Sequence, residues 1–212
     1  MFIEVNRICS PVSTLGPGKR LGLWLQGCDI QCAGCVSKDT WQRGLGQYLK
    51  VTDLAELVIQ TVNTEQLDGI SITGGEPTLQ GNALVELLRL VKIDCSPSFD
   101  VAIFTGLAER DLIESWPSLT READVFICGP YVKELSNAGS LLASKNQTFY
   151  FPNGCTEEYR QSFEEVNNQL QTSVANGDIT FAGIPRPGDM QIIEQMLIDR
   201  GVVLGETSWE NC

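Results

Sequence analysis

Three cysteines lie within one eight-residue stretch, at Cys28, Cys32 and Cys35. The glycines at 27 and 34 allow the backbone to fold around a compact object. A zinc ion would need a fourth ligand, here a distant cysteine or a carboxylate. A four-iron cluster is held by thiolates, and three of them leave one iron open, as in catalytic metal sites. Grouping by chance is a third alternative, but the spacing favours an iron–sulfur cluster.

The chain contains no histidine, which excludes serine–histidine and cysteine–histidine nucleophiles and every histidine-ligated zinc or haem site. Cys128 lies in an apolar run and is expected in the core. No second cluster motif accompanies the remaining cysteines, and we assign no role to the scattered thiols of Cys9, Cys95, Cys128, Cys155 and Cys212.

Turns rich in glycine follow several apolar runs. The sequence Thr-Gly-Gly-Glu-Pro at 73–77 ends one run, and Thr105-Gly106 and Gly129-Pro130 end two others. Function collects at the carboxyl ends of strands in parallel sheets. We therefore expect these turns and the cysteine loop to share one edge of the sheet.

The elements that must position these residues alternate between strands and helices. This alternation is typical of βα units and a mostly parallel sheet. The segment 27–46 has no periodicity and is expected to be a long ordered loop. Strands are predicted at 3–5, 20–25, 69–73, 99–104, 124–128, 148–151 and 178–181.

Helical spacing begins at Asp53, where Glu56 completes a capping signal. Further helices are predicted over 84–91, 107–116, 157–170 and 189–200. The last is expected to turn Ile192, Ile193, Met196 and Leu197 toward the core. Five or six units are too few for a closed eight-stranded barrel of about 250 residues. The predicted fold is a partial open (βα) barrel, α/β in class, as a single domain over 1–212.

Composition sets the broad class. The chain has 212 residues, of which 42% are hydrophobic and 20% charged, which is typical of a globular protein. No apolar run is long enough to span a membrane, and the acidic start at Glu4 does not fit a signal peptide, so a cytoplasmic location is expected. The net charge of −12 argues against a nucleic-acid partner. Residues 1–51 nevertheless carry a net +3.

The cysteine spacing and the Gly-Gly-Glu-Pro turn together resemble the two signatures of the radical S-adenosylmethionine (SAM) superfamily. Over about residues 3–152, the chain resembles the branch that activates anaerobic ribonucleotide reductases. It departs from the usual pattern at Val36-Ser37, which follow the third cysteine. The branch resemblance rests on 16–20, 26–28, 34–35, 129–131 and 144–147.

This resemblance implies a [4Fe-4S] cluster on Cys28, Cys32 and Cys35, with SAM chelating the open iron. One electron would cleave SAM to a 5′-deoxyadenosyl radical, which takes a hydrogen atom from the substrate. Gly75 would leave space for the methionine part of SAM. No separate catalytic residue is assigned, and the expected SAM-binding residues are Gly34, Val36, Gly74, Gly75, Glu76 and Thr105.

Three functions stay open from the sequence. The first is an activase that installs a glycyl radical on a partner enzyme, with a flavodoxin or ferredoxin as electron donor. The second is a stand-alone enzyme that modifies a ribosomal precursor peptide, and the third is a non-catalytic metal-binding module. For a protein partner, the positive first quarter predicts docking at the cluster end, with Arg20 and Arg43 on the docking face. Segment 153–212 is expected to extend the same domain.

Overall fold

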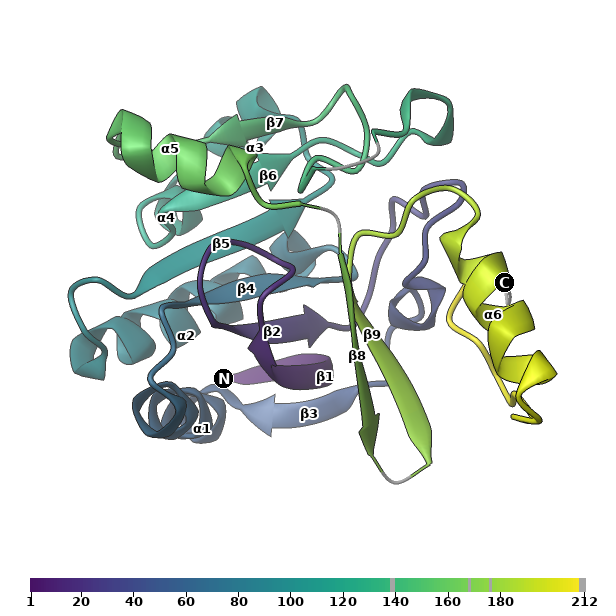
Figure 1. The fold of residues 1–212 in the computed structure, drawn as a ribbon. Helices are drawn as coiled ribbons and strands as arrows, with labels where there is room; N and C mark the ends of the chain where they lie inside the picture. Colours follow the sequence, from purple (N-terminus) through teal and green to yellow (C-terminus); the bar gives the residue numbers. More distant parts are fainter. Residues whose placement is uncertain (138–139, 168, 176, 210–212) are drawn as a thin grey trace.

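The centre of the protein is a seven-stranded sheet with strand order β3-β1-β2-β4-β5-β6-β7 (Figure 1). The computed structural model describes residues 1–137, 140–167, 169–175 and 177–209. Strands β2, β4, β5 and β6 pair in parallel, whereas β3–β1, β1–β2 and β6–β7 pair antiparallel. The strands are β1 (Phe2–Val12), β2 (Arg20–Leu25), β3 (Gln47–Lys50), β4 (Gly69–Gly74), β5 (Asp100–Thr105), β6 (Val125–Cys128) and β7 (Thr148–Tyr150).

Along the described chain, four helices connect strands of the sheet. Figure 1 shows two of them, α1 and α2, beside each other along the sheet. They are α1 (Val51–Glu65), α2 (Gly81–Asp94), α3 (Glu109–Ser115) and α4 (Pro117–Thr120). Three short 3-10 turns are η1 (Lys38–Thr40), η2 (Pro77–Gln80) and η3 (Lys133–Leu135). After β7 come α5 (Glu157–Glu164), an antiparallel hairpin of β8 (Leu170–Ala175) and β9 (Asp178–Gly183), and α6 (Asp189–Asp199).

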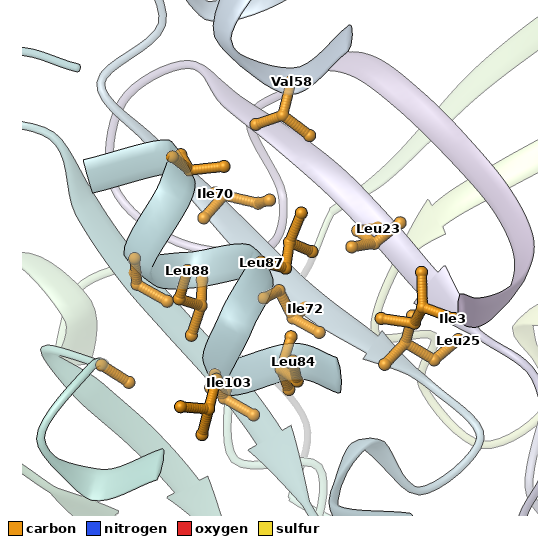
Figure 2. Packing of buried hydrophobic residues seen from close by; sticks show 14 of the residues in the cluster. Ile3, Leu23, Leu25, Val58, Ile70, Ile72, Leu84, Leu87, Leu88 and Ile103 are labelled. Atoms are coloured by element: carbon orange, nitrogen blue, oxygen red, sulfur yellow. The ribbon is translucent and has the colours of Figure 1, made fainter. Parts of the chain in front are cut away.

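The main core lies between α1, α2 and the central strands (Figure 2). Leu84, Leu87 and Leu88 recur at the spacing of one helix face, and each is fully buried. They belong to one cluster with Ile72 of β4 and Ile103 of β5. Burial of each such side chain contributes roughly 1.5–3 kcal/mol. This core fixes the strand ends from which the site is built.

A buried ion pair marks the amino ends of the parallel strands. Arg20 is completely buried, forms an ion pair with Asp100 and donates from Nε to the hydroxyl of Ser71 at 2.7 Å. Its guanidinium also lies over the ring of Phe163 from α5, 5.6 Å from the ring centroid. Arg20 therefore ties β2, β4, β5 and α5 together at the sheet edge opposite the glycine-rich turns.

The predicted α/β class and the mostly parallel strand direction are confirmed, and the sheet is open at β3 and β7. The predicted number of βα units, five to six, is too large. In the described residues, three parallel crossovers join β2, β4, β5 and β6. The first and last strands of the sheet in chain order, β1 and β7, are antiparallel to their neighbours, and the described residues of their connections to β2 and from β6 form no α-helix.

Some predicted element boundaries are wrong. Helix α1 begins at Val51, ahead of Asp53, and its N-cap Lys50 makes no side-chain cap. Helix α5 ends at Glu164 rather than at the predicted residue 170, and Leu170 is instead the first residue of strand β8. The sequence contained a missed hairpin signal at Asn176-Gly177, since Asn-Gly between alternating runs favours a tight turn.

The predicted core face of the last helix is wrong for two of its four residues, since Ile193 and Leu197 are half-buried but Ile192 and Met196 are not. Ile192 and Met196 of α6 are 59% and 47% exposed, and the buried residue of this helix is Met190. Helix α6 lies at the end of the molecule toward which β2 points, rather than on a face of the sheet (Figure 1). No helix in the described part of the chain is long and apolar enough to cross a membrane.

Candidate functional site

A cavity of about 1260 Å³ opens at the carboxyl edge of the parallel strands. Its walls come from the loop after β2, the turns after β4, β5 and β6, and the C-terminal hairpin, helix and tail. The cavity brings together every residue that the sequence assigned to a site. These are Cys28, Cys32, Gly34, Cys35, Val36, Gly74, Gly75, Glu76 and Thr105.

The cysteine loop is closed at its base by two backbone hydrogen bonds. The amide of Gly27 donates to the carbonyl of Thr40 at 2.7 Å, and that of Cys28 donates to Trp41 at 2.9 Å. A tight turn inside the loop brings the amide of Cys35 to the carbonyl of Cys32 at 3.1 Å. Gly34 permits this turn with a φ of +81°. The loop is thus ordered, as predicted, with the short turn η1 inside it.

Two buried polar side chains hold the flanks of this loop. Gln26 donates from its amide to the carbonyl of Asp39 at 2.9 Å. The carboxylate of Glu4 accepts from the amides of Gly44 and Gly46 at 2.7 and 2.9 Å. Because these partners are far apart in the sequence, the loop's position is set by tertiary contacts with β1 and β2.

The Gly-Gly-Glu turn packs directly on the start of the cysteine loop. The amide of Gly75 donates to Leu25 and that of Glu76 donates to Gly27, both at 2.8 Å. A Cβ on Gly75 would overlap the carbonyl oxygen of Gly27. The structure thus gives a packing reason for this glycine, and the space for methionine stays a prediction.

Glu76 is buried and its carboxylate is saturated with hydrogen bonds. It accepts from the hydroxyl of Thr105 at 2.8 Å, the amide of Gly106 at 2.7 Å, and the amide and hydroxyl of Thr78 at 3.0 and 2.7 Å. Glu76 thereby locks the turn after β4 to the turn after β5. A direct role in SAM binding for Glu76 and Thr105 stays a prediction.

Nitrogen donors surround two of the three cysteine sulfurs. Burial is the main factor that raises the pKa of the Cys32 and Cys35 thiols. The backbone amide of Tyr131 at Cys32, and the backbone amide of Ser37 with the Trp41 side chain at Cys35, act in the opposite direction on each pKa. The Ser37 amide lies 3.4 Å from the Cys35 sulfur. These donors would stabilise thiolates bound to a metal centre.

The donor set consists of three thiolates, the usual ligands of an iron–sulfur cluster. Within the described residues, no three cysteine, aspartate or glutamate side chains converge on one metal position. Zinc would need its ligands about 2.0–2.3 Å from a single point. In a four-iron cluster each thiolate binds a different iron, so three sulfurs around one cavity satisfy it. The chemistry of the loop therefore fits a [4Fe-4S] cluster held by Cys28, Cys32 and Cys35.

The other predicted thiols and charges have clear positions. Cys128 is buried, which confirms its place in the core, and burial raises its pKa to about 12. Cys212 lies outside the described residues. The prediction that Arg20 belongs to a docking face is wrong, because it is buried at the other end of the sheet. Arg43 is exposed and pairs with Asp29.

Sequence reasoning missed the outer wall of the cavity. This wall contains Phe181 of β9 and the tail residues Ser208 and Trp209. The amide of Lys38 donates to the carbonyl of Ser208 at 2.9 Å, and the Ser208 hydroxyl donates to the carbonyl of Val36 at 2.8 Å. No local pattern connects residues this distant, so only the hairpin signal could have pointed to the wall.

Comparison with known proteins supports the cluster assignment. Residues 14–150 match the family model described as a 4Fe-4S single cluster domain. An anaerobic ribonucleoside-triphosphate reductase-activating protein from Vibrio cholerae is 30% identical over 140 residues, covering 64% of this chain and 89% of the relative. A pyruvate formate-lyase-activating enzyme from Listeria monocytogenes is 34% identical over 79 residues, or 36% and 32% of the two chains.

A solved structure, that of QueE from Escherichia coli, aligns with 50% of this chain and 53% of its own at 20% identity. Its TM-score of 0.38 is too low to identify a shared fold. The match to the family model covers the cysteine loop and the glycine-rich turns. The chain therefore belongs to the 4Fe-4S single-cluster family, as a radical SAM enzyme of the activating-protein type whose cofactors are a [4Fe-4S] cluster and SAM.

Proposed function

We propose that this enzyme uses SAM to install a glycyl radical on a partner protein of the anaerobic ribonucleotide reductase class. One observation carries the proposal. The cysteine loop and the Gly-Gly-Glu turn are hydrogen-bonded to each other and line one cavity, within the region that matches the family model. The proposed electron donor is a flavodoxin or ferredoxin.

When bound, the reduced cluster supplies one electron to SAM, which yields methionine and a 5′-deoxyadenosyl radical that takes one hydrogen atom from the substrate. The residues of this chain hold and orient those groups. Cys28, Cys32 and Cys35 would hold the cluster, and the backbone at Gly74 would face SAM. Glu76 keeps the two strand-end turns in register through its hydrogen bonds to Thr105 and Gly106.

A glycine of the partner would lose one hydrogen atom to the 5′-deoxyadenosyl radical, which leaves a glycyl radical on the partner and 5′-deoxyadenosine as the other product. Each activation therefore consumes one electron and one SAM. The test is anaerobic incubation of the reconstituted enzyme with SAM, a strong reductant and the catalytic subunit of an anaerobic ribonucleotide reductase. We expect a persistent doublet in the electron paramagnetic resonance (EPR) spectrum of the reductase, with one 5′-deoxyadenosine formed per radical. The Cys28→Ala variant should give neither product.

A second function, modification of a short precursor peptide, is favoured by a different observation. The family match ends at residue 150, but residues beyond it form a complete wall of the cavity. This additional wall would contact a short peptide held in the cavity. Formation of a cross-linked or epimerised peptide, without any persistent protein radical, would decide for this function and against the activase.

A further inference from the structure

The outer wall of the cavity has a chemistry of its own. It consists of β9, α6 and residues 204–209, which all lie beyond the family match. Its apolar members are Ile179, Phe181, Met190, Leu197, Leu204 and Trp209. The lining residues that this wall contributes include two acids, Asp178 and Glu206, and no lysine or arginine. The wall itself therefore presents like charges to an acidic ligand, whereas the cations of the cavity lining, Arg7 and Lys38, lie on β1 and the cysteine loop.

The wall is anchored to the body of the protein at two places. Beside the cysteine loop, Ser208 exchanges hydrogen bonds with the backbone of Lys38 and Val36, at 2.9 and 2.8 Å. At the hairpin, the buried hydroxyl of Thr14 donates to the carbonyl of Ala182 at 2.9 Å. These contacts hold the apolar side chains opposite the predicted cluster ligands, across one cavity.

An unpaired donor lies in this wall. The indole nitrogen of Trp209 is buried and has no acceptor among the described residues. The Trp209 ring packs edge-to-face on Phe181, with centroids 6.2 Å apart. Buried N–H groups without a partner are rare in folded proteins, and an unmade bond of this kind is costly. A carbonyl oxygen from a bound molecule would satisfy the indole.

The cavity is large enough for two molecules. Its volume of about 1260 Å³ exceeds the range of roughly 300–1,000 Å³ that is typical of single-ligand pockets. SAM would occupy the part between the cysteine loop and the Gly-Gly-Glu turn. The part along Phe181 and Trp209 is then free for a substrate.

We propose that this outer wall binds the substrate, and that the substrate enters as an extended, non-acidic peptide segment with apolar side chains beside the reacting residue. A peptide supplies backbone carbonyls for the Trp209 indole and apolar groups for the wall. The inference rests on the proposed function for the reaction, and it adds the chemical class of the segment and the residues that select it. Phe181 and Trp209 act here as specificity-determining residues.

Calorimetric titration with two synthetic heptapeptides tests this. The probe is acetyl-Ala-Leu-Val-Gly-Val-Leu-Ala-amide, and its counterpart has glutamate at the four leucine and valine positions. With reconstituted enzyme and SAM under anaerobic conditions, we expect the apolar peptide to bind at least about tenfold more tightly. Hydrogen exchange should slow in β9 and at residues 204–209 when the peptide is present.

Two variants identify the wall as the binding surface. Trp209→Phe keeps the ring contact but removes the indole donor, and should weaken peptide binding about fivefold. Phe181→Ala should weaken it about tenfold or more. The matched control is Ile192→Ala, on α6 but 59% exposed and outside the cavity lining. Iron content and binding of radiolabelled SAM should be unchanged in all three variants.

The possible outcomes separate this inference from the proposed function. The inference is overturned if neither peptide binds, if both bind equally, if the two wall variants bind like the wild type, or if ATP displaces the peptide. Selective peptide binding together with no glycyl radical on any reductase would leave the inference standing and remove the activase function. If the wall variants form the glycyl radical equally well and their peptide binding is unchanged, the activase function stands and the inference about the wall is overturned.

Discussion

The body of the protein, residues 1–150, and the C-terminal segment, residues 151–209, are built in different ways. In the body, the sheet and four helices share a continuous apolar core. In the described part of the segment, the buried apolar side chains are few, and Val174, Ile192, Met196 and Val203 are largely exposed. The C-terminal end of the segment, at Ser208, is held in place by hydrogen bonds to the body and not by a core of its own. The segment's buried apolar residues are Phe151, Phe163, Ala182 and Met190.

This difference suggests a division of labour. Contacts within the body position the turns after β4 and β5 and the base of the cysteine loop, and the segment adds the hydrogen bonds of Ser208 to Lys38 and Val36. The segment supplies a cavity wall whose side chains carry little of the fold's stability. Substrate choice can then change with the sequence of the segment, without cost to the chemistry at the sheet edge.

The largest contrast should appear in metal content. Replacement of Cys28, Cys32 and Cys35 by alanine should remove the cluster completely, because these three thiolates are its proposed protein ligands. Cys155→Ala, in the segment and outside the cavity lining, is the matched control and should keep its iron. Iron and sulfide analysis after anaerobic reconstitution measures both. Full iron in the triple variant would place the cluster elsewhere.

The second largest contrast should appear in the free energy of unfolding when a buried charge is removed. Arg20→Met removes one partner of a buried ion pair and should lower the free energy of unfolding by about 4 kcal/mol, because Asp100 loses its counter-charge. Arg200→Met, at an exposed position of the segment, should change it by less than about 0.5 kcal/mol. Urea unfolding measures the difference. Equal effects would mean that the two regions are less distinct than their burial indicates.

Apolar truncations sharpen the same contrast. Leu87→Ala in α2 should cost about 3 kcal/mol of unfolding free energy, because a fully buried side chain leaves a cavity. Ile192→Ala in α6 should cost less than about 0.5 kcal/mol, since most of its surface already contacts water. A large loss for Ile192→Ala would reveal that α6 packs against more of the molecule than its exposure shows.

The smallest effect concerns local opening without any substitution. Amides of β8 and α6 should exchange with solvent about a hundredfold faster than those of β4 and β5, because few buried contacts must break to expose them. Hydrogen–deuterium exchange with mass spectrometry measures both regions in one sample. Equal protection would show that the segment unfolds only together with the body.

Local patterns in the sequence were enough for much of the site. The cysteine spacing, the Gly-Gly-Glu-Pro turn and Thr105 each follow a predicted strand, and parallel strands bring such turns to one edge. The apolar periodicity of α2 likewise predicted the leucines that the core buries. These features depend on neighbouring residues, whose type and spacing are visible without a fold.

Other features were decided only by the tertiary structure. The reason for Gly75 is a contact with Gly27, and the burial of Arg20 depends on Asp100, which is 80 residues away. The tail reaches the cysteine loop through Ser208 and Val36, 172 residues apart. Contacts over such separations leave no periodic trace in the sequence, because they arise only after the sheet has brought distant segments to the same edge.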